Sequence, residues 1–525
     1  MGKKKQIRSE VKGNVKNSIG RIAFAALAVL LQIGWILILM IKLYQYSSVI
    51  SLLTSLFALV VALRIYGKHT NAAFKMPWII VILAFPVFGL CIYGLFGHKE
   101  AMHKIIRKFE DVDAQLIPLN VQDETILQQL EQEDPLLANQ CHYIWKYGNY
   151  PVYDTTAVKF YPEAYLGYEE QLKELEKAKH FIFLEYHAIE EAEAFARLKD
   201  VLARKAAEGV EVRILYDDVG CIGFLDKSFI DRMNAIGVQC RVFNYVVPFL
   251  NIFMNNRDHR KIMVIDGKVG FTGGYNLADE YFNITHPYGY WKDTGVKLTG
   301  RAVQNFTMMF LEMWNVMGQA DTDYEKYLKA SQEGAEDGNV QKASGYVQPY
   351  ADSPLDGEPV GENVYLNLIK TAKKRLYVAT PYLIISDEMT RELGLAAKRG
   401  VDVRVFTPGI PDKKLIYSIT RSFYSGLVKN GVRIYEWTPG FCHAKMSVAD
   451  DCMATCGTIN LDYRSLYHHF ENGCFMADCA AVTEIREDME RTMVQSREVT
   501  EQYRSGQKAQ LQLGQMFLRL FAELL

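Results

Sequence analysis

Few features of this 525-residue sequence point to disulfides, bound metal or nucleic acid. Its nine cysteines are odd in number and form no Cys-x-x-Cys pair, so the sequence predicts small buried thiols and neither a disulfide framework nor a zinc site. Lysine plus arginine (59) nearly equals aspartate plus glutamate (61), which gives no reason to expect broad nucleic-acid binding. With 49% hydrophobic residues, the chain is neither disordered nor collagen-like, and its length exceeds one ordinary domain.

The charge asymmetry that does exist lies at the N-terminus. Residues 1–21 form a strongly basic flank, and they precede three long uncharged runs at 22–41, 44–63 and 76–96. Because about 20 residues of helix cover a hydrocarbon core of ~30 Å, these runs predict two to three transmembrane helices. Soluble core helices are usually shorter or amphipathic, and no small-x-small cleavage site follows the first run. Both a soluble protein and a cleaved signal peptide are therefore disfavoured.

The membrane face of the remaining chain stays open. If all three runs cross, ten basic residues flank the side of the N-terminus and five flank the other side. The positive-inside rule then puts the N-terminus in the cytoplasm and the C-terminal region outside. If one run only dips into the bilayer, the C-terminal region faces the cytoplasm instead.

Beyond residue 110, short β-branched runs alternate with helix-like stretches, which is the pattern of an α/β domain. The pattern occurs twice: segments at 178–185, 209–215 and 237–243 are echoed 191 to 194 residues later, at 372–379, 400–406 and 431–436. A repeat of this size fits two homologous domains. We therefore predict a first domain over 110–320, an acidic linker over 321–345 and a second domain over 346–525.

Each half contains the same cassette of candidate catalytic residues. The shared pattern is H-x-K-x4-D-x6-G-x2-N, formed by His259, Lys261, Asp266 and Asn276 in the first half and by His443, Lys445, Asp450 and Asn460 in the second. Two copies in register with a repeat far exceed what chance gives in a chain of this length.

The spacing of the cassette suits chemistry on a phosphodiester. In an extended segment alternate side chains share a face, so His259 and Lys261 point the same way, as do the corresponding residues of the second half. A pseudo-twofold axis would bring both pairs into one cleft. The lysines and asparagines then bind phosphate oxygens, one imidazole attacks phosphorus, and the other protonates the leaving oxygen.

The remaining acidic and histidine residues are given smaller parts. Asp266 and Asp450 complete the catalytic cassettes, and a part in the local fold or hydrogen-bond network is favoured over contact with phosphorus. His468 and His469 are adjacent but lack a third ligand at metal spacing, so they are interpreted as structural and no metal site is predicted.

The duplicated cassette resembles the HKD motif of the phospholipase D superfamily, and the wider similarity is to bacterial cardiolipin synthases. It covers nearly the whole chain and includes Trp78–Gly97, His259–Gly267, Thr272–Asn276, Gly440–Lys445, Gly457–Ser465 and Phe470–Glu471. The resemblance implies two phospholipase D-like α/β domains, related by pseudo-twofold symmetry, behind N-terminal helices in a bacterial cell membrane.

The resemblance also implies a reaction. A phosphatidyl group passes from one phosphatidylglycerol to a histidine, glycerol leaves, and a second phosphatidylglycerol attacks to give cardiolipin, without metal or nucleotide. Superfamily members orient each catalytic histidine with an acidic residue about 25 to 35 positions further on, and here Asp293 and Glu471 match by place. By analogy His259 is the nucleophile and His443 the acid, although the symmetry of the sequence leaves the assignment open.

Three departures and three alternatives accompany this interpretation. His187 stands where a tyrosine is expected, Gly274 replaces a common serine, and the C-terminus lacks a proline often found there. The same histidines would also serve a phospholipase D with water as acceptor or a phosphatidylserine synthase with serine. A noncatalytic membrane scaffold would be marked by a broken cassette, and both cassettes here are intact.

Apolar residues of the C-terminal tail fall on one helical face that either docks on the domain or lies on lipid: Leu513, Met516, Phe517, Leu520, Phe521 and Leu524.

Overall fold

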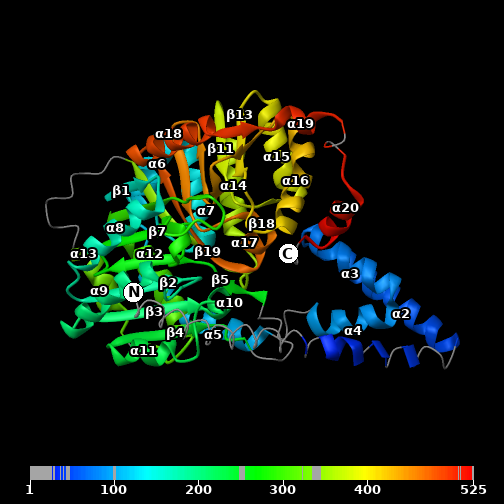
Figure 1. Ribbon diagram of the computed structural model, residues 1–525, viewed down its shortest axis with the longest axis horizontal. Helices are drawn as coiled ribbons and strands as arrows, with labels where there is room; N and C mark the ends of the chain where they lie inside the picture. The colour runs from blue at the N-terminus through cyan, green and yellow to red at the C-terminus, as the bar shows by residue number, and fades with distance from the viewer. Residues whose placement is uncertain are drawn as a thin grey trace.

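Two β-sheets with covering helices form the body of the protein, and a group of N-terminal helices projects from one side of it (Figure 1). The computed structural model describes residues 27, 30–35, 37–38, 41–42, 48–97, 102–246, 255–321, 323–333, 345–506, 508 and 510–522. The basic flank at 1–21 and half of the predicted span at 22–41 lie outside these residues.

The first sheet has the strand order β1-β9-β7-β6-β2-β3-β4. Its strands are β1 Thr156–Tyr161, β2 Phe181–Tyr186, β3 Glu211–Asp217, β4 Val238–Phe243, β6 Lys261–Ile265, β7 Val269–Gly273 and β9 Gly295–Gly300. Strands β2, β3 and β4 pair in parallel. The other neighbours, β1 with β9, β9 with β7, β7 with β6 and β6 with β2, pair antiparallel. Strand β2 is buried along its whole length, as expected for a strand covered on both faces.

The second sheet repeats this order as β10-β19-β17-β16-β11-β13-β14, with β20 added at the edge. Its strands are β10 Tyr346–Asp352, β11 Arg375–Ala379, β13 Asp402–Pro408, β14 Arg433–Trp437, β16 Met446–Ala449, β17 Met453–Gly457, β19 His469–Ala477 and β20 Ser496–Glu498. The three repeated segments of the sequence form β2, β3 and β4 in one sheet and β11, β13 and β14 in the other, so the predicted duplication of an α/β unit is confirmed.

Helices α12 (Val303–Val316) and α18 (Ala480–Val494) each contact strands of both sheets. Side chains of the two halves therefore share one apolar core, in which Phe183 of β2 stacks on Phe310 of α12 with ring centroids 4.4 Å apart. The other helices of the first half are α5 His103–Leu116, α8 Ala164–Leu175, α9 Glu193–Ala207, α10 Asp218–Cys221 and α11 Phe229–Ala235, with short 3-10 turns η2 Ile117–Leu119 and η4 Asp279–Phe282. This shared core fixes the two halves against each other.

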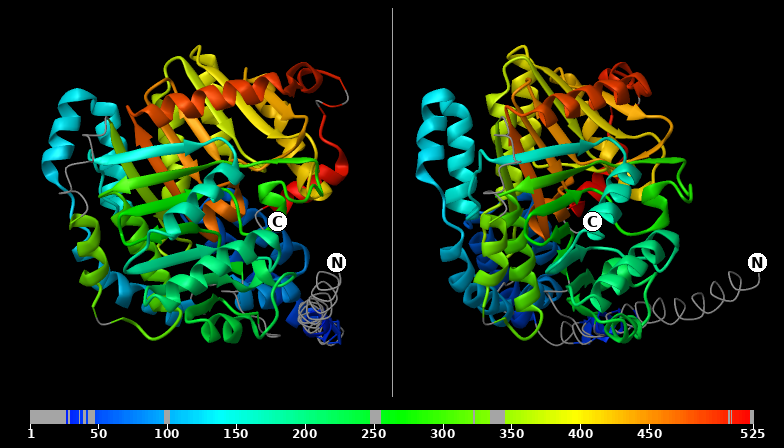
Figure 2. Two further views of the ribbon diagram at one scale, coloured as in Figure 1. Left: turned by 60° about the vertical axis from the view of Figure 1, so that its left-hand side comes forward. Right: turned by 90° about the vertical axis from the view of Figure 1, so that its left-hand side faces the viewer.

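The second sheet is covered by helices from both parts of the chain. Those that follow it in sequence are α14 Val360–Thr371, α15 Asp387–Lys398, α16 Lys414–Lys429, α17 Tyr463–Tyr467, α19 Thr500–Arg504 and α20 Leu513–Leu520. Helices α6 (Glu124–Glu133) and α7 (Pro135–Gly148), which precede the first sheet, also pack into this core (Figure 2, cyan). Residues 124–148 thus support the second sheet although they fall in the first predicted domain. Helix α13 (Glu325–Glu333) lies within the predicted linker.

The N-terminal helices differ from the sequence prediction. The run at 44–63 contributes to α2 (Ser48–Tyr66), whereas the run at 76–96 forms two helices, α3 (Ala72–Ala84) and α4 (Pro86–Phe96). The single helix predicted over 76–96 is wrong because Pro86 has no N–H to donate to the preceding turn and begins a new helix. Within the part of the chain that the structure describes, no helix has both the length and the apolar content of a membrane span.

Helices α3 and α4 approach closely at Gly89. A Cβ atom at this position would lie 2.5 Å from Cα of Ile82, so only glycine allows the contact. Apolar side chains of α2 nevertheless remain exposed on several sides, including Leu53, Phe57 and Leu63. Such exposure is unusual for a helix in water and indicates an apolar environment.

Candidate active site

Each candidate histidine follows a short strand that pairs with the opposite half of the chain. His259 comes after β5 (Arg257–Asp258), which runs parallel to the start of β19, and its N–H donates to the carbonyl of Phe470 at 2.9 Å. His443 comes after β15 (Gly440–Cys442), which pairs with β8 (Tyr290–Lys292), and its N–H donates to the carbonyl of Lys292 at 2.7 Å. The backbone of each half therefore positions the histidine of the other.

The carboxylate partners of the histidines are exchanged between the halves. Nδ1 of His259 lies 2.8 Å from Oε1 of Glu471, and Nδ1 of His443 lies 2.6 Å from Oδ2 of Asp293. The structure places both acidic residues that the resemblance singles out beside the histidines, but their places along the chain suggest the pairs His259–Asp293 and His443–Glu471. That expectation is wrong because Glu471 lies near the start of β19 and Asp293 directly follows β8, and both strands pair with the opposite half.

The two histidines and the two lysines share one electrostatic environment. Burial lowers the pKa of His259 well below its ordinary value, and Lys261, Lys445 and His443 lower it further. Burial, Lys445 and Lys261 act in the same direction on the pKa of His443. Both imidazoles are therefore neutral at pH 7, and with Nδ1–H directed at a carboxylate each keeps a lone pair on Nε2. The structure thus brings both halves of the cassette together, as predicted.

The lysines lie beside the histidines. Nζ of Lys261 donates to the carbonyl oxygen of His259 at 2.6 Å, and Nζ of Lys445 donates to that of His443 and lies 2.8 Å from its Nδ1. Burial lowers the pKa of Lys261 to about 7 and that of Lys445 to about 8, against the opposing effect of the nearby carboxylates. An anionic group bound here would stabilise both ammonium ions.

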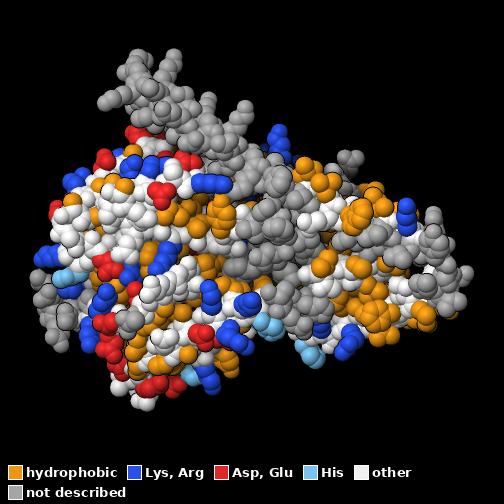
Figure 3. Space-filling view, turned by 90° about the horizontal axis from the view of Figure 1, so that it is seen from below, with side chains coloured by type: hydrophobic (Ala, Val, Ile, Leu, Met, Phe, Trp, Pro, Cys, Tyr) orange, Lys and Arg blue, Asp and Glu red, His pale blue; other side chains and the backbone are white. Residues whose placement is uncertain are grey.

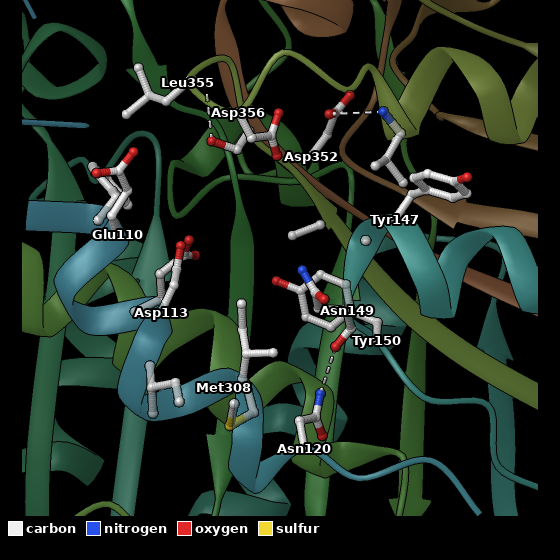
Figure 4. A pocket seen from close by; sticks show the side chains of 18 of the residues that line it. Glu110, Asp113, Asn120, Tyr147, Asn149, Tyr150, Met308, Asp352, Leu355 and Asp356 are labelled. Carbon is white, nitrogen blue, oxygen red and sulfur yellow. Dashed lines mark hydrogen bonds between the residues drawn. The ribbon is translucent and has the colours of Figure 1, made fainter. Parts of the chain in front are cut away.

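The intervening residue Arg260 points the other way. Its guanidinium donates to Glu312 and to the carbonyl of Met309, on the opposite face of the sheet from Lys261. A pocket of about 330 Å³ lies on that side, lined by α5, α12 and the segment after β10, and its wall includes Glu110, Asp113 and Asp356 (Figure 4). The pocket is separate from the histidines, and the alternation of side chains predicted for this segment is confirmed.

The aspartates of the cassettes lie outside the histidine site. Asp266 follows the far end of β6, about 17 Å of extended chain from Lys261. Its carboxylate accepts the N–H groups of Lys179, His180 and Phe181, at 2.8 to 2.9 Å, just where β2 begins. Asp450 accepts those of Lys373, Lys374 and Arg375 at the start of β11. Both aspartates have positive φ, 52° and 54°. This geometry supports the part in the local fold.

Replacing Asp450 with alanine is therefore expected to act on stability. Three backbone N–H groups lose a charged acceptor, and because two of them are exposed to water we expect a loss of about 2 kcal/mol in the free energy of unfolding. Thermal and denaturant unfolding would measure it. Asp450→Asn, which keeps an acceptor and tolerates positive φ, should lose less. A stable Asp450→Ala protein without activity would instead place this carboxylate in the chemistry.

The asparagines of the two cassettes have different surroundings. Asn276 donates from Nδ2 to the hydroxyl of Tyr281 and accepts the N–H of Ala188. Asn460 is also buried, and its Oδ1 has no hydrogen-bond partner among the described residues. Two of the hydrogen-bonding groups of Asn276 thus hold the loop between β7 and β8. Phosphate binding by Asn276 and Asn460 stays a prediction.

Two further histidines that the sequence did not assign to the site surround His259. The ring of His187 lies 5.0 Å from that of His259, and its Nδ1 lies 2.7 Å from the carbonyl of Asp258. The ring of His469 lies 5.5 Å away, and ligand atoms of His259, His469 and Glu471 lie within 4.8 Å of one another. The fold therefore gives His469 the further ligands that sequence spacing did not. His469 shares a strand with Glu471, two residues apart, and that spacing was the available signal.

Gly274 explains one departure from the resemblance. A Cβ atom at this position would lie 2.1 Å from Oδ1 of Asp293. In the second half the corresponding residue is Thr458, whose hydroxyl donates to Glu471. Glycine thus makes room for one carboxylate where threonine hydrogen-bonds the other, so the two histidine–carboxylate pairs are supported by different neighbours.

Comparison with known families gives two matches. A family described as "Cardiolipin synthase, PLD-like domain" matches residues 172–314 and 365–493, which contain both histidines. A second family, "Phospholipase_D-nuclease N-terminal", matches residues 54–98.

Individual proteins resemble the chain over most of its length. An uncharacterised protein of Streptococcus mutans serotype c is 41% identical over 86% of this chain and 96% of its own. A cardiolipin synthase of Alkalihalophilus pseudofirmus is 33% identical over 84% of this chain and 86% of its own. Among solved structures, a phosphatidylserine synthase of Haemophilus influenzae Rd KW20 aligns with a TM-score of 0.53 and 14% identity, over 70% of this chain and 93% of the other. At that identity the last likeness concerns the fold.

Proposed function

The chain belongs to the cardiolipin synthase family of phospholipase D-like proteins and is a phosphatidyltransferase of that type, and from this premise we propose that it makes cardiolipin from two molecules of phosphatidylglycerol. The observation that supports the proposal is the pair of buried, neutral imidazoles, each held by a carboxylate of the other half and each beside a lysine. Such a site provides a nucleophile, an acid and two cations for one phosphodiester.

The first step forms a phosphohistidine. Nε2 of His259 attacks phosphorus of the bound phosphatidylglycerol, and the bond from phosphorus to the glycerol headgroup oxygen breaks. His443, protonated on Nε2 once the anionic substrate is bound, gives that proton to the oxygen, and glycerol leaves. Lys261 and Lys445 bind the non-bridging oxygens and stabilise the charge that develops on them.

The second step reverses the part played by the acid. His443, now neutral, accepts the proton of a terminal hydroxyl on the second phosphatidylglycerol while the hydroxyl oxygen attacks phosphorus. The bond from phosphorus to Nε2 of His259 breaks, which releases cardiolipin and restores both side chains. Because burial keeps the free imidazoles neutral, protonation of the acid depends on the anionic substrate, whose charge raises the pKa of the nearby histidine.

We further propose attachment to the bacterial membrane through the N-terminal helices. The exposed apolar side chains of α2 and the neighbouring residues Met76 and Leu83 of α3 support it, since such a surface is unstable in water (Figure 3). Basic residues Arg64, Lys68 and Lys75 lie at the turn between these helices, where anionic lipid headgroups would attract them.

Product analysis tests the proposed reaction. Purified protein in detergent with phosphatidylglycerol as sole lipid is expected to give cardiolipin and free glycerol in equal amounts, detected by mass spectrometry. Phosphatidic acid alone would make water the acceptor and the protein a phospholipase D. A product formed only with added serine would favour the phosphatidylserine synthase alternative. No turnover with any of these would support the scaffold.

The lysines predict how activity depends on pH. With pKa values of about 7 for Lys261 and about 8 for Lys445, the free enzyme loses ammonium charge as pH rises through this interval. The value of kcat/KM for phosphatidylglycerol should therefore fall on the alkaline side of about pH 7 to 8, since kcat/KM reports the free enzyme. Initial rates at low substrate from pH 5.5 to 9.5 would measure it. A profile that stays flat across this range would contradict the assignment.

Metal ions are expected to inhibit this site and not to assist it. Protein side chains supply nucleophile, acid and cations, so excess EDTA should leave turnover within about twofold of its starting value. Added Zn²⁺ should lower it, because His259, His469 and Glu471 offer two imidazoles and a carboxylate within reach of one ion. Rates in Zn²⁺ titrations of the wild type and of His469→Asn, which lacks one ligand, would measure the effect. Loss of activity in EDTA that Mg²⁺ restores would refute this expectation.

A further inference from the structure

Helix α20, at residues 513–520, is fixed to the body of the protein by one of its faces. Nε2 of Gln515 donates to the carbonyl of Ser418 in α16, and the guanidinium of Arg519 lies 4.1 Å above the ring of Phe423. Leu518 packs against the core of the second half, and Ala522, just beyond the helix, is buried in it. These residues recur at the spacing of one helical face.

The opposite face of α20 is apolar and uncovered. Leu513 is 83% exposed, Phe517 is 65% exposed, and Met516 between them is also exposed. The predicted apolar face of the tail is therefore not the face that docks on the domain. A surface helix in water normally presents polar residues outward, so three large apolar side chains on one outward face require another environment.

Helix α20 lies beside the N-terminal helices, next to the end of α3 that adjoins the body (Figure 1). The exposed apolar surface of α3 and α2, which includes Met76, Ile80 and Phe57, thus continues onto α20. The basic turn between α2 and α3 belongs to the same region of the chain. An apolar surface with basic residues at its border matches a bilayer containing anionic lipid.

The same region adjoins the histidine site. Phe74 of α3 packs on Tyr463 and Tyr467 of α17, with ring centroids 5.7 and 4.9 Å apart. Helix α17 lies in the segment between Asn460 and Glu471, the carboxylate partner of His259. A bilayer in contact with α3 would therefore lie close to the segment that supports the proposed phosphohistidine.

We infer that the outward face of α20 is a lipid-contacting surface that holds the second half of the protein on the bilayer beside α3. Leu513, Met516 and Phe517 enter the acyl region, while Gln515 and Arg519 keep the helix on α16. The N-terminal helices and α20 then contact the bilayer at two separate points of the chain, which orients the histidine site toward its lipid substrate. The surface itself is independent of the reaction, but its kinetic consequence rests on the proposed function.

Photocrosslinking of the full chain tests the contact directly. The photoreactive residue p-benzoylphenylalanine would replace Phe517, and protein in vesicles of phosphatidylglycerol and phosphatidylcholine would be irradiated and examined by mass spectrometry. Matched controls carry the same residue at Gln515, which faces α16, and at Val494, an exposed residue at the end of α18. We expect lipid adducts at 517 and few at the two control positions. A crosslinked dimer, or adducts only within the chain, would overturn the inference.

Kinetics provide a second readout. The variant Leu513→Ser/Met516→Ser/Phe517→Ser should lower kcat/KM about tenfold with phosphatidylglycerol in vesicles, yet leave it nearly unchanged when the lipid is dispersed in detergent. An equal loss in both media would mean that these residues act in folding, against the inference. If the protein makes no cardiolipin at all, the proposed function fails, while the crosslinks still decide whether α20 contacts lipid.

Discussion

Replacing either His259 or His443 with alanine is expected to lower the rate of cardiolipin formation by about 10³-fold or more. In the proposed mechanism, one substitution removes the atom that bonds to phosphorus and the other removes the group that protonates the leaving oxygen, and each such contribution is worth about 10² to 10⁴. Because both side chains act in a single step, the double variant should be little worse than either single one. Initial rates with radiolabelled phosphatidylglycerol would measure these losses.

A substrate with a better leaving group distinguishes the two histidines. A phosphatidyl ester of nitrophenol needs little protonation of its leaving oxygen, so the variant that lacks only the acid should recover much of its rate. We expect this recovery for His443→Ala and not for His259→Ala. Rapid quenching in denaturant at alkaline pH, where the bond from phosphorus to the imidazole nitrogen survives, should trap label on the former protein only. If the rate of His259→Ala recovers instead, His443 is the nucleophile and His259 the acid. If the rates of both variants recover, a phosphohistidine intermediate is contradicted.

The second prediction concerns the two carboxylates that are exchanged between the halves. Asp293→Asn should impair His443, and Glu471→Gln should impair His259, each by about 10² to 10⁴, because the amide no longer favours the tautomer and charge that the histidine needs. The two variants should therefore behave differently with the nitrophenyl ester. Asp293→Asn should recover much of its rate, as His443→Ala does, whereas Glu471→Gln should stay slow, as His259→Ala does.

The control for these two variants is a test that each one still folds. Both carboxylates are fully buried, so each variant needs a measured melting temperature before its rate is interpreted. Asp293→Asn and Glu471→Gln keep the size of the side chain, and folded proteins are expected. If Asp293→Asn instead behaves like His259→Ala, the functional pairs would follow the order of the chain and not the contacts described here.

Much of the architecture follows from local patterns. Alternating strand and helix signals and the repeat near 194 residues predict two α/β sheets, and the strands β2, β3 and β4 recur as β11, β13 and β14. The same patterns find both cassettes, and the resemblance to the phospholipase D superfamily points to both acidic residues. They cannot assign the acidic partners, because proximity along the chain favours Asp293 for His259, whereas strand pairing between the halves gives it to His443.

Two other features differ from the sequence prediction for separate reasons. The run at 76–96 forms two helices because Pro86 begins a new one, and Gly89 then lets that helix pack closely on Ile82. Sequence spacing suggests a structural part for His469, yet β5 carries His259 to it from more than 200 residues away. Only the second result depends on contacts between segments that no local pattern relates.

The reciprocal pairing also determines how the molecule can open. A hinge motion that swung one half away from the other would break His259–Glu471 and His443–Asp293 together, along with the β5–β19 and β15–β8 ladders and the shared core. The protein therefore cannot act as a clamp that closes on its ligand. Under the proposed function, a lipid headgroup must instead reach the buried histidines while the two halves stay joined, so turnover depends on lateral exchange of lipids beside them.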